Sequence, residues 1–107
     1  MTELDILKEF LSYPLNSVDE IMERFKTLPN AEKKKRKGNG EQPQFVFVRG
    51  NREDAATLVA HADTVFDVAE HEFSEKNGII RSASPDYGLG ADDRAGCAIL
   101  WLLLLRH

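Results

Sequence analysis

The chain has 107 residues, of which 42% are hydrophobic and 30% are charged, a composition typical of one globular domain and not of a disordered segment. Its longest apolar run, Ala98–Leu105, has eight residues, whereas a membrane-spanning helix needs about 20, so we expect no membrane partner. The net charge of −4 becomes −9 when the five bases of Lys33–Lys37 are left out, and an acidic body of this kind is a poor nucleic-acid binder.

The N-terminal third predicts two amphipathic helices. In the first, Thr2 and Asp5 have the spacing of a capping box, and apolar residues then recur every three to four positions until Pro14. In the second, Ser17 and Glu20 repeat the capping-box spacing before another apolar stripe. Each helix has one apolar face that must pack on another element.

The middle of the chain predicts a loop and several strands. Residues 30–43 hold the basic run, two glycines and a proline, a composition that indicates an exposed basic loop. Phe45–Val48 and Thr57–Ala60 are short apolar runs, and the second suits a strand buried on both faces of an α/β sheet. Asn77–Gly78 predicts a turn, followed by a short strand at Ile79–Ile80.

The last predicted helix extends from about Asp93 to Arg106. Its segment Ala98–Leu105 is apolar on every side and therefore needs protein all around it. A chain of this size offers too little structure to cover such a helix. We therefore expect residues 1–107 to be part of a larger fold, with this helix partly uncovered and prone to self-association in the isolated chain.

Two clusters of residues carry chemistry. His61 and Asp63 follow a predicted strand two residues apart, which puts both side chains on one face about 7 Å apart. A neutral imidazole is a good zinc ligand, and a carboxylate on its other nitrogen fixes its tautomer and direction. Asp92 and Asp93 follow a glycine-rich turn at a helix start, where capping of the helix is the alternative to metal binding.

The combination of an apolar run, the sequence HADTV, and then GLGADDRAGCA closely resembles the dinuclear zinc exopeptidase superfamily, which includes peptidase T, the aminoacylases and carboxypeptidase G. The resemblance extends over about the whole chain, although residues 57–65 and 78–98 carry its specificity. It implies an α/β fold, namely the N-terminal portion of the phosphorylase/hydrolase-like three-layer fold. That portion has two N-terminal helices, a few sheet strands and a buried C-terminal helix.

The resemblance also implies roles for individual residues. His61 corresponds to a ligand of the first metal, Asp92 to the carboxylate that bridges two metals, and Asp63 to the catalytic-site carboxylate that orients His61. Asp93 lies where the family often has an unusual cis peptide bond, and Arg94 matches a basic position with a structural role. The implied reaction is hydrolysis of a peptide or N-acyl amino acid bond by a metal-activated water, with two zinc ions and with manganese or cobalt as alternatives.

The family's general-base glutamate, its further carboxylate ligands and its final histidine have no counterpart in this sequence. Two ligands are too few for a catalytic zinc site, so we expect the 107-residue chain alone to be inactive. The alternative is a non-catalytic remnant or interaction module of the same fold. A weaker alternative is a nucleic-acid binder that uses Lys33–Lys37, against which we note that no aromatic residue interleaves with these bases.

The remaining candidate residues have ordinary structural interpretations. We expect His71 to be a solvated loop residue, Cys97 to be buried packing and Trp101 to belong to the core. A single cysteine allows no internal disulfide, and the first residues lack the pattern of a secretory signal, so we expect a cytoplasmic protein.

Overall fold

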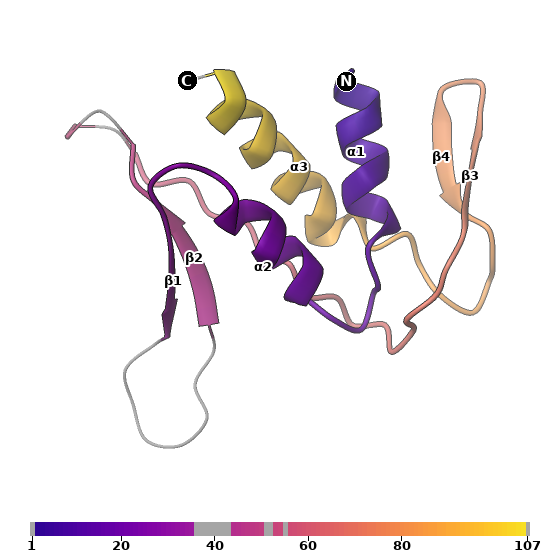
Figure 1. The fold of residues 1–107 in the computed structure, drawn as a ribbon. Coiled ribbons are helices and arrows are strands. Elements are labelled where there is room, and N and C mark those ends of the chain that lie inside the picture. Colours follow the sequence, from indigo (N-terminus) through magenta and orange to yellow (C-terminus); the bar gives the residue numbers. More distant parts are fainter. Residues whose placement is uncertain (1, 36–43, 51–52, 55, 107) are drawn as a thin grey trace.

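Three helices form the centre of the molecule, and two β-hairpins lie on opposite sides of them (Figure 1). The computed structural model describes residues 2–35, 44–50, 53–54 and 56–106. The helices are α1 (Glu3–Ser12), α2 (Asp19–Lys26) and α3 (Ala91–Arg106). The strands β1 (Ala31–Lys35) and β2 (Gln44–Val48) form one antiparallel sheet, and β3 (Phe73–Lys76) and β4 (Ile79–Ser82) form another. The predicted α/β class is confirmed, whereas the three-layer arrangement stays a prediction.

Local capping signals explain where the first helix begins, but not the second. Thr2 Oγ1 accepts a hydrogen bond from the backbone N–H of Asp5 at 3.1 Å, and the Asp5 carboxylate accepts the Thr2 N–H at 2.9 Å. The capping box predicted for α1 is therefore confirmed. The one predicted for Ser17 and Glu20 is wrong, because α2 begins at Asp19 and its N-cap residue makes no side-chain hydrogen bond. Ser17 instead accepts the Asp19 N–H at 3.3 Å as part of the turn before the helix.

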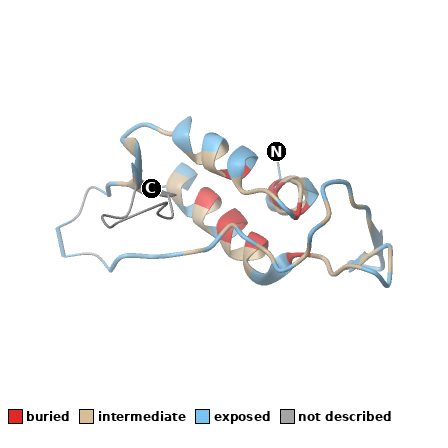
Figure 2. Cartoon of the chain, turned by 90° about the horizontal axis from the view of Figure 1, so that it is seen from below, coloured by how far each residue is buried: buried red, intermediate tan, exposed pale blue. Residues whose placement is uncertain are grey.

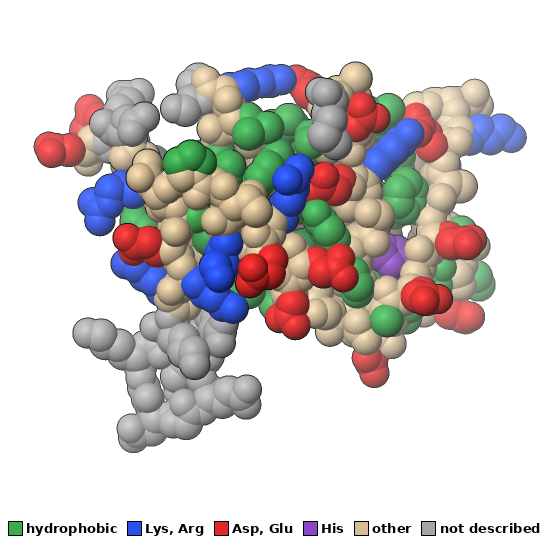
Figure 3. Space-filling view, viewed as in Figure 1, with side chains coloured by type: hydrophobic (Ala, Val, Ile, Leu, Met, Phe, Trp, Pro, Cys, Tyr) green, Lys and Arg blue, Asp and Glu red, His purple; other side chains and the backbone are tan. Residues whose placement is uncertain are grey.

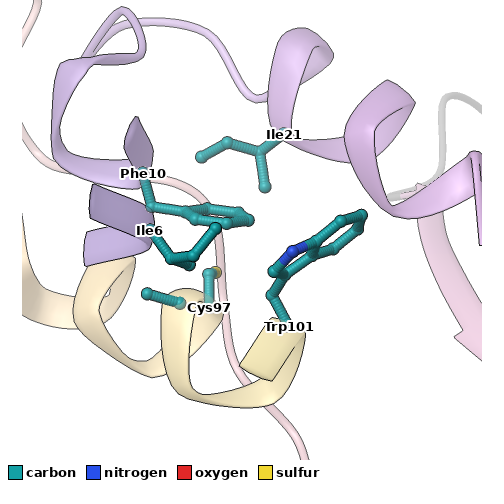
Figure 4. Packing of buried hydrophobic residues seen from close by; sticks show 6 residues of the cluster. Ile6, Phe10, Ile21, Cys97 and Trp101 are labelled. Atoms are coloured by element: carbon teal, nitrogen blue, oxygen red, sulfur yellow. The ribbon is translucent and has the colours of Figure 1, made fainter. Parts of the chain in front are cut away.

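The hydrophobic core lies where the three helices meet. Phe10 of α1 is fully buried between Ile21 of α2 and Cys97 of α3 (Figure 4). The Phe10 and Trp101 rings pack with their centroids 6.2 Å apart, and Ile6 closes the cluster from α1. Cys97 and Trp101 are thus core residues, as predicted, and among the helices α1 and α3 are the principal packing partners.

Burial in the described residues is confined to the helices and the loops beside them, while both hairpins are exposed or half-buried (Figure 2). Helix α3 itself is covered on one side only. Ile99 is 59% exposed and Leu105 58% exposed, and Leu103 is exposed as well. Hydrophobic side chains are accordingly visible among the charged ones on the face over the helices (Figure 3). The partial uncovering predicted for this helix is confirmed.

The first hairpin corrects the expected loop at residues 30–43. Residues 31–35 form β1, because β2 supplies a strand whose backbone groups they pair with in register. Residues 36–43 lie outside the described part of the chain. Lys34 lies opposite Phe45, and its Nζ is 5.2 Å from the centre of the Phe47 ring. Pairing thus brings basic and aromatic residues together where the linear sequence separates them, and the absence of a nucleic-acid partner stays a prediction.

The buried strand expected at Thr57–Ala60 is wrong for this structure. These residues have no regular secondary structure, and Leu58 and Val59 are 61% and 84% exposed. A strand needs a partner for its backbone groups, and neither hairpin in the described part of the chain pairs with this segment. Leu58 and Val59 are therefore uncovered here, whereas Ala60 is half-buried against the core.

The second hairpin follows the sequence signal closely. Asn77 and Gly78 have φ of +54° and +76°, the left-handed conformation that both central residues of a type I′ turn require. The turn joins β3 to β4, so the predicted turn and the strand at Ile79–Ile80 are confirmed. Strand β3 was not expected, because Phe73–Lys76 has only one apolar residue.

Candidate metal centre

The segment that begins at His61 runs beside the start of α3, and this brings the predicted metal residues together. His61 Nε2 lies 3.1 Å from Asp92 Oδ1. The other ring nitrogen, Nδ1, lies 3.1 Å from both Asp63 Oδ1 and the Asp63 carbonyl oxygen. The expected convergence of His61 and Asp92, with Asp63 behind the imidazole, is therefore confirmed.

The two carboxylates also affect the pKa of the imidazole. Desolvation lowers the pKa of His61, but the hydrogen bonds and negative charges of Asp63 and Asp92 outweigh it and hold this pKa above its ordinary value. All three side chains are exposed to solvent. Asp63 and Asp92 therefore favour the protonated form of this imidazole more than water does.

Three side chains of α3 hold the backbone on either side of the imidazole. The Asp93 carboxylate accepts the N–H of His61 at 3.3 Å, and the Cys97 thiol donates to the His61 carbonyl oxygen at 3.4 Å. Arg94 Nε donates to the carbonyl oxygen of Ala62 at 2.5 Å. The position of His61 is thus set from α3 through its backbone as well as through its ring.

Arg94 is fully buried and joins three parts of the molecule. Besides Ala62 it donates to the carbonyl oxygens of Tyr13, Pro14 and Ser17, at 3.0–3.3 Å, in the connection between α1 and α2. Burial lowers the pKa of this guanidinium from its ordinary value. These four carbonyl acceptors satisfy most of its donors, which agrees with the structural role that the resemblance implies.

Two glycines of the second motif allow the close approaches in this region. At Gly90, which has φ of +77°, a Cβ would lie 2.6 Å from Leu15 Cδ2. At Gly96, a Cβ would lie 2.2–2.6 Å from the Asp93 carboxylate, which occupies that space. Asp93 was expected only to follow the bridging carboxylate, and its hold on His61 was missed. The sequence signal for this contact was Gly96, which lies one helical turn after Asp93 and leaves room for its carboxylate.

The peptide bond between Asp92 and Asp93 is cis, as the resemblance implied. Both residues have non-helical backbone angles, so the regular part of α3 starts after them, near the predicted start at Asp93.

A groove of about 420 Å³ leads away from the His61–Asp92 pair. Its walls come from the residues after His61 and from the glycine-rich turn before α3. Besides His61, Asp63 and Asp92, they are Thr64, Val65, Phe66, Gly88, Leu89, Gly90 and Ala91. The charged residues that line this groove are thus the predicted metal pair and Asp63.

The donor set fits one part of a zinc site. An imidazole nitrogen and a carboxylate oxygen that meet at 3.1 Å, with the second ring nitrogen held by another carboxylate, match how zinc ligands are presented in proteins. Within the ranges that the structure describes, no group of three histidine, cysteine or acidic side chains is placed to hold a metal ion. The ligand roles of His61 and Asp92 stay predictions.

His71 differs from its predicted place in a solvated loop. It is half-buried, its Nε2 lies 2.6 Å from the carbonyl oxygen of Leu11, and its ring packs edge-on against Tyr87. This contact ties the segment before β3 to the end of α1. The spacing along the sequence held no signal for it, because Leu11 is 60 residues away.

No protein-family model matches this sequence, and neither a curated protein nor a solved structure matches it. None of the helices in the described part of the chain has the length and hydrophobicity that crossing a membrane requires.

Proposed function

We propose that this chain carries the N-terminal part of the metal site of a zinc-dependent exopeptidase or related amidohydrolase, which cleaves peptide or N-acyl amino acid bonds. One observation supports the proposal most: His61 Nε2 faces Asp92 while Asp63 holds Nδ1. A metal-ligating histidine usually donates its other ring N–H to a carboxylate, and Asp63 is placed to accept it.

Each residue has a distinct task in this proposal. His61 Nε2 and the Asp92 carboxylate would hold the metal, and manganese or cobalt are alternatives to zinc. With a metal bound, Asp63 would accept a hydrogen bond from Nδ1–H of the neutral imidazole, which leaves the Nε2 lone pair for the metal and fixes the direction of the ring. The chemistry that bound zinc supplies is polarisation of the substrate carbonyl and a lower pKa for a water molecule.

The general base and the remaining ligands come from outside the described residues. Asp63 is occupied by the imidazole, so it is not available to take a proton from a water. We therefore propose that the chain alone binds metal weakly and does not hydrolyse peptides, because general-base catalysis by itself is worth about 10²–10⁴-fold. The three-layer exopeptidase fold and a cytoplasmic location belong to the same proposal.

The test is zinc binding to the purified chain, measured by isothermal titration calorimetry. Zinc should bind the wild-type chain, and His61→Ala and Asp92→Asn should abolish the binding. Asp63→Asn should weaken it by about 10–100-fold, because the ring loses its fixed direction. Asp86→Asn, the same change at an exposed aspartate outside the site, should leave it unchanged.

Two results would contradict the proposal. If zinc affinity is the same in wild type and in His61→Ala, the pair is not a metal site, and an interaction module without chemistry becomes the better interpretation. If the purified chain hydrolyses dipeptides with added zinc, manganese or cobalt, and Asp92→Asn abolishes the activity, the chain completes its site by other means.

A further inference from the structure

Apart from His61, Asp63 and Asp92, the groove beside the metal pair is lined mainly by apolar side chains and glycines. Val65 is 93% exposed, and with Leu89 and Phe66 it forms an apolar surface. The Phe66 ring lies directly against the backbone at Gly88, where a Cβ would be only 2.6 Å away. The walls of the groove therefore expose an aromatic ring, aliphatic side chains and the backbone of glycine residues.

The one hydroxyl in these walls is already engaged. Thr64 Oγ1 donates to the carbonyl oxygen of Leu15 at 2.7 Å and accepts the N–H of Phe66 at 3.2 Å. The charged side chains that line the groove are those of Asp63, His61 and Asp92. Among the other lining residues no side chain is left to form a hydrogen bond with a polar substrate side chain, whereas Val65, Phe66 and Leu89 offer apolar contact.

We propose that this groove binds the uncharged, apolar side chain of the substrate residue next to the hydrolysed bond. The inference rests on the proposed function, because that function places the hydrolysed bond at the His61–Asp92 pair. The volume of about 420 Å³ falls in the range of small-molecule sites, and a mostly apolar wall with polar groups at one end is typical of them. The substrate class is thus peptides or N-acyl amino acids with an aliphatic or aromatic residue at this position.

The experiment is an NMR titration of the ¹⁵N-labelled full chain with two neutral probes of similar size, N-acetyl-leucinamide and N-acetyl-glutaminamide. We expect the leucine probe to shift the amide signals of Thr64–Phe66 and Gly88–Gly90, and to bind at least about fivefold more tightly than the glutamine probe. Val65→Ser should weaken binding of the leucine probe by about three- to tenfold. Val59→Ser, the same change at another exposed valine outside the groove, should have no effect.

Equal affinities of the two probes would overturn the inference. Amide signal shifts at Ile99 and Leu103 on α3, in place of the groove, would do so as well. So would a Val65→Ser variant that binds the leucine probe as tightly as wild type does. A separate zinc titration without probes distinguishes this failure from that of the proposed function. If zinc binds through His61 but the leucine probe shows no preference, only the substrate inference is wrong. If the leucine probe binds in the groove but zinc does not bind, the metal site is wrong and the groove serves another apolar ligand.

Discussion

Asp93 and Cys97 hold the two polar backbone atoms of His61 from the same turn of α3. The ring of His61 is exposed, so packing does little to restrain it, and these backbone contacts take over that task. The space that Gly96 leaves open lets the Asp93 carboxylate lie close to the helix while it reaches the N–H of His61. At this scale the candidate site depends on residues that would not themselves touch a metal.

Replacing Asp93 tests this dependence. Asp93→Ala should weaken zinc binding by about tenfold, because the His61 N–H loses its acceptor and the segment can move away from Asp92. Asp93→Asn keeps an acceptor oxygen and should stay within about threefold of wild type. Calorimetric titration of both variants is the measurement, with circular dichroism as the check on folding. An Asp93→Ala variant that is folded and binds zinc like wild type would show that the backbone contact is dispensable.

The Cys97 thiol gives a second prediction at the scale of a residue. Burial raises the pKa of this thiol to about 11, and only 3% of the residue is exposed. At pH 8 the thiolate fraction should therefore be about 100-fold lower than in the unfolded chain. Since Cys97 is the only cysteine, the rate of iodoacetamide labelling reports on it alone. Native protein should label at least about 100-fold more slowly than protein in denaturant, and the rate should rise as pH approaches 11.

At the scale of elements, Arg94 is the connection between α3, the His61 segment and the loop from α1 to α2. A buried guanidinium is costly unless its donors are satisfied, and here backbone carbonyls satisfy them in place of a carboxylate. The carbonyls in turn depend on Arg94, because buried acceptors without a donor destabilise a fold. The helix that carries Asp92 is in this way held at a definite place relative to His61.

Arg94→Met should lower the free energy of unfolding by at least about 3 kcal/mol, because it leaves several buried carbonyls without a donor. Urea unfolding followed by circular dichroism measures this. Arg81→Met is the matched control, since Arg81 is exposed, and it should change stability by less than about 0.5 kcal/mol. Equal stability of the two variants would mean that Arg94 does not join these elements in solution.

At the scale of the whole molecule, the chain is less compact than its length allows. Its radius of gyration is 15.0 Å, against about 13 Å for a globular domain of this size. The two hairpins extend to opposite sides of the helices, with the first in contact with α2, and one side of α3 is open (Figure 1). An apolar helix surface that no other element covers favours contact with a second molecule.

We expect the isolated chain to associate with itself as its concentration rises. Ile99→Glu places a charge on the open side of α3 and should shift sedimentation velocity profiles toward the monomer. Ile79→Glu makes the same change at an exposed isoleucine of β4 and should leave association unchanged. A wild-type chain that is monomeric at all concentrations, unfolds cooperatively and binds no hydrophobic dye would contradict this expectation.

Short-range signals were sufficient for parts of the fold, and the resemblance carried by two motifs led to the centre of the site. Thr2 and Asp5 are close in sequence and form their capping box, and Asn77–Gly78 forms its turn. The motifs at His61 and Asp92 led to the convergence that the structure has, although they lie 31 residues apart. In the capping box and the turn, the interacting groups are neighbours along the chain. For His61 and Asp92, the two motifs together indicated the contact, which the spacing of either motif alone does not.

Only the tertiary structure decided where pairing and burial occur. Residues 31–35, which include the first part of the basic run, form β1 because Phe45–Val48 lies alongside them. Thr57–Ala60 has no partner strand, and Leu58 and Val59 are exposed. His71 is half-buried because the end of α1 passes beside it, and Asp93 reaches His61 because α3 starts there. Each of these outcomes depends on which distant groups are within hydrogen-bonding or packing distance. Composition and periodicity describe a segment by itself, so they determine its preferred conformation but not the partner that stabilises it.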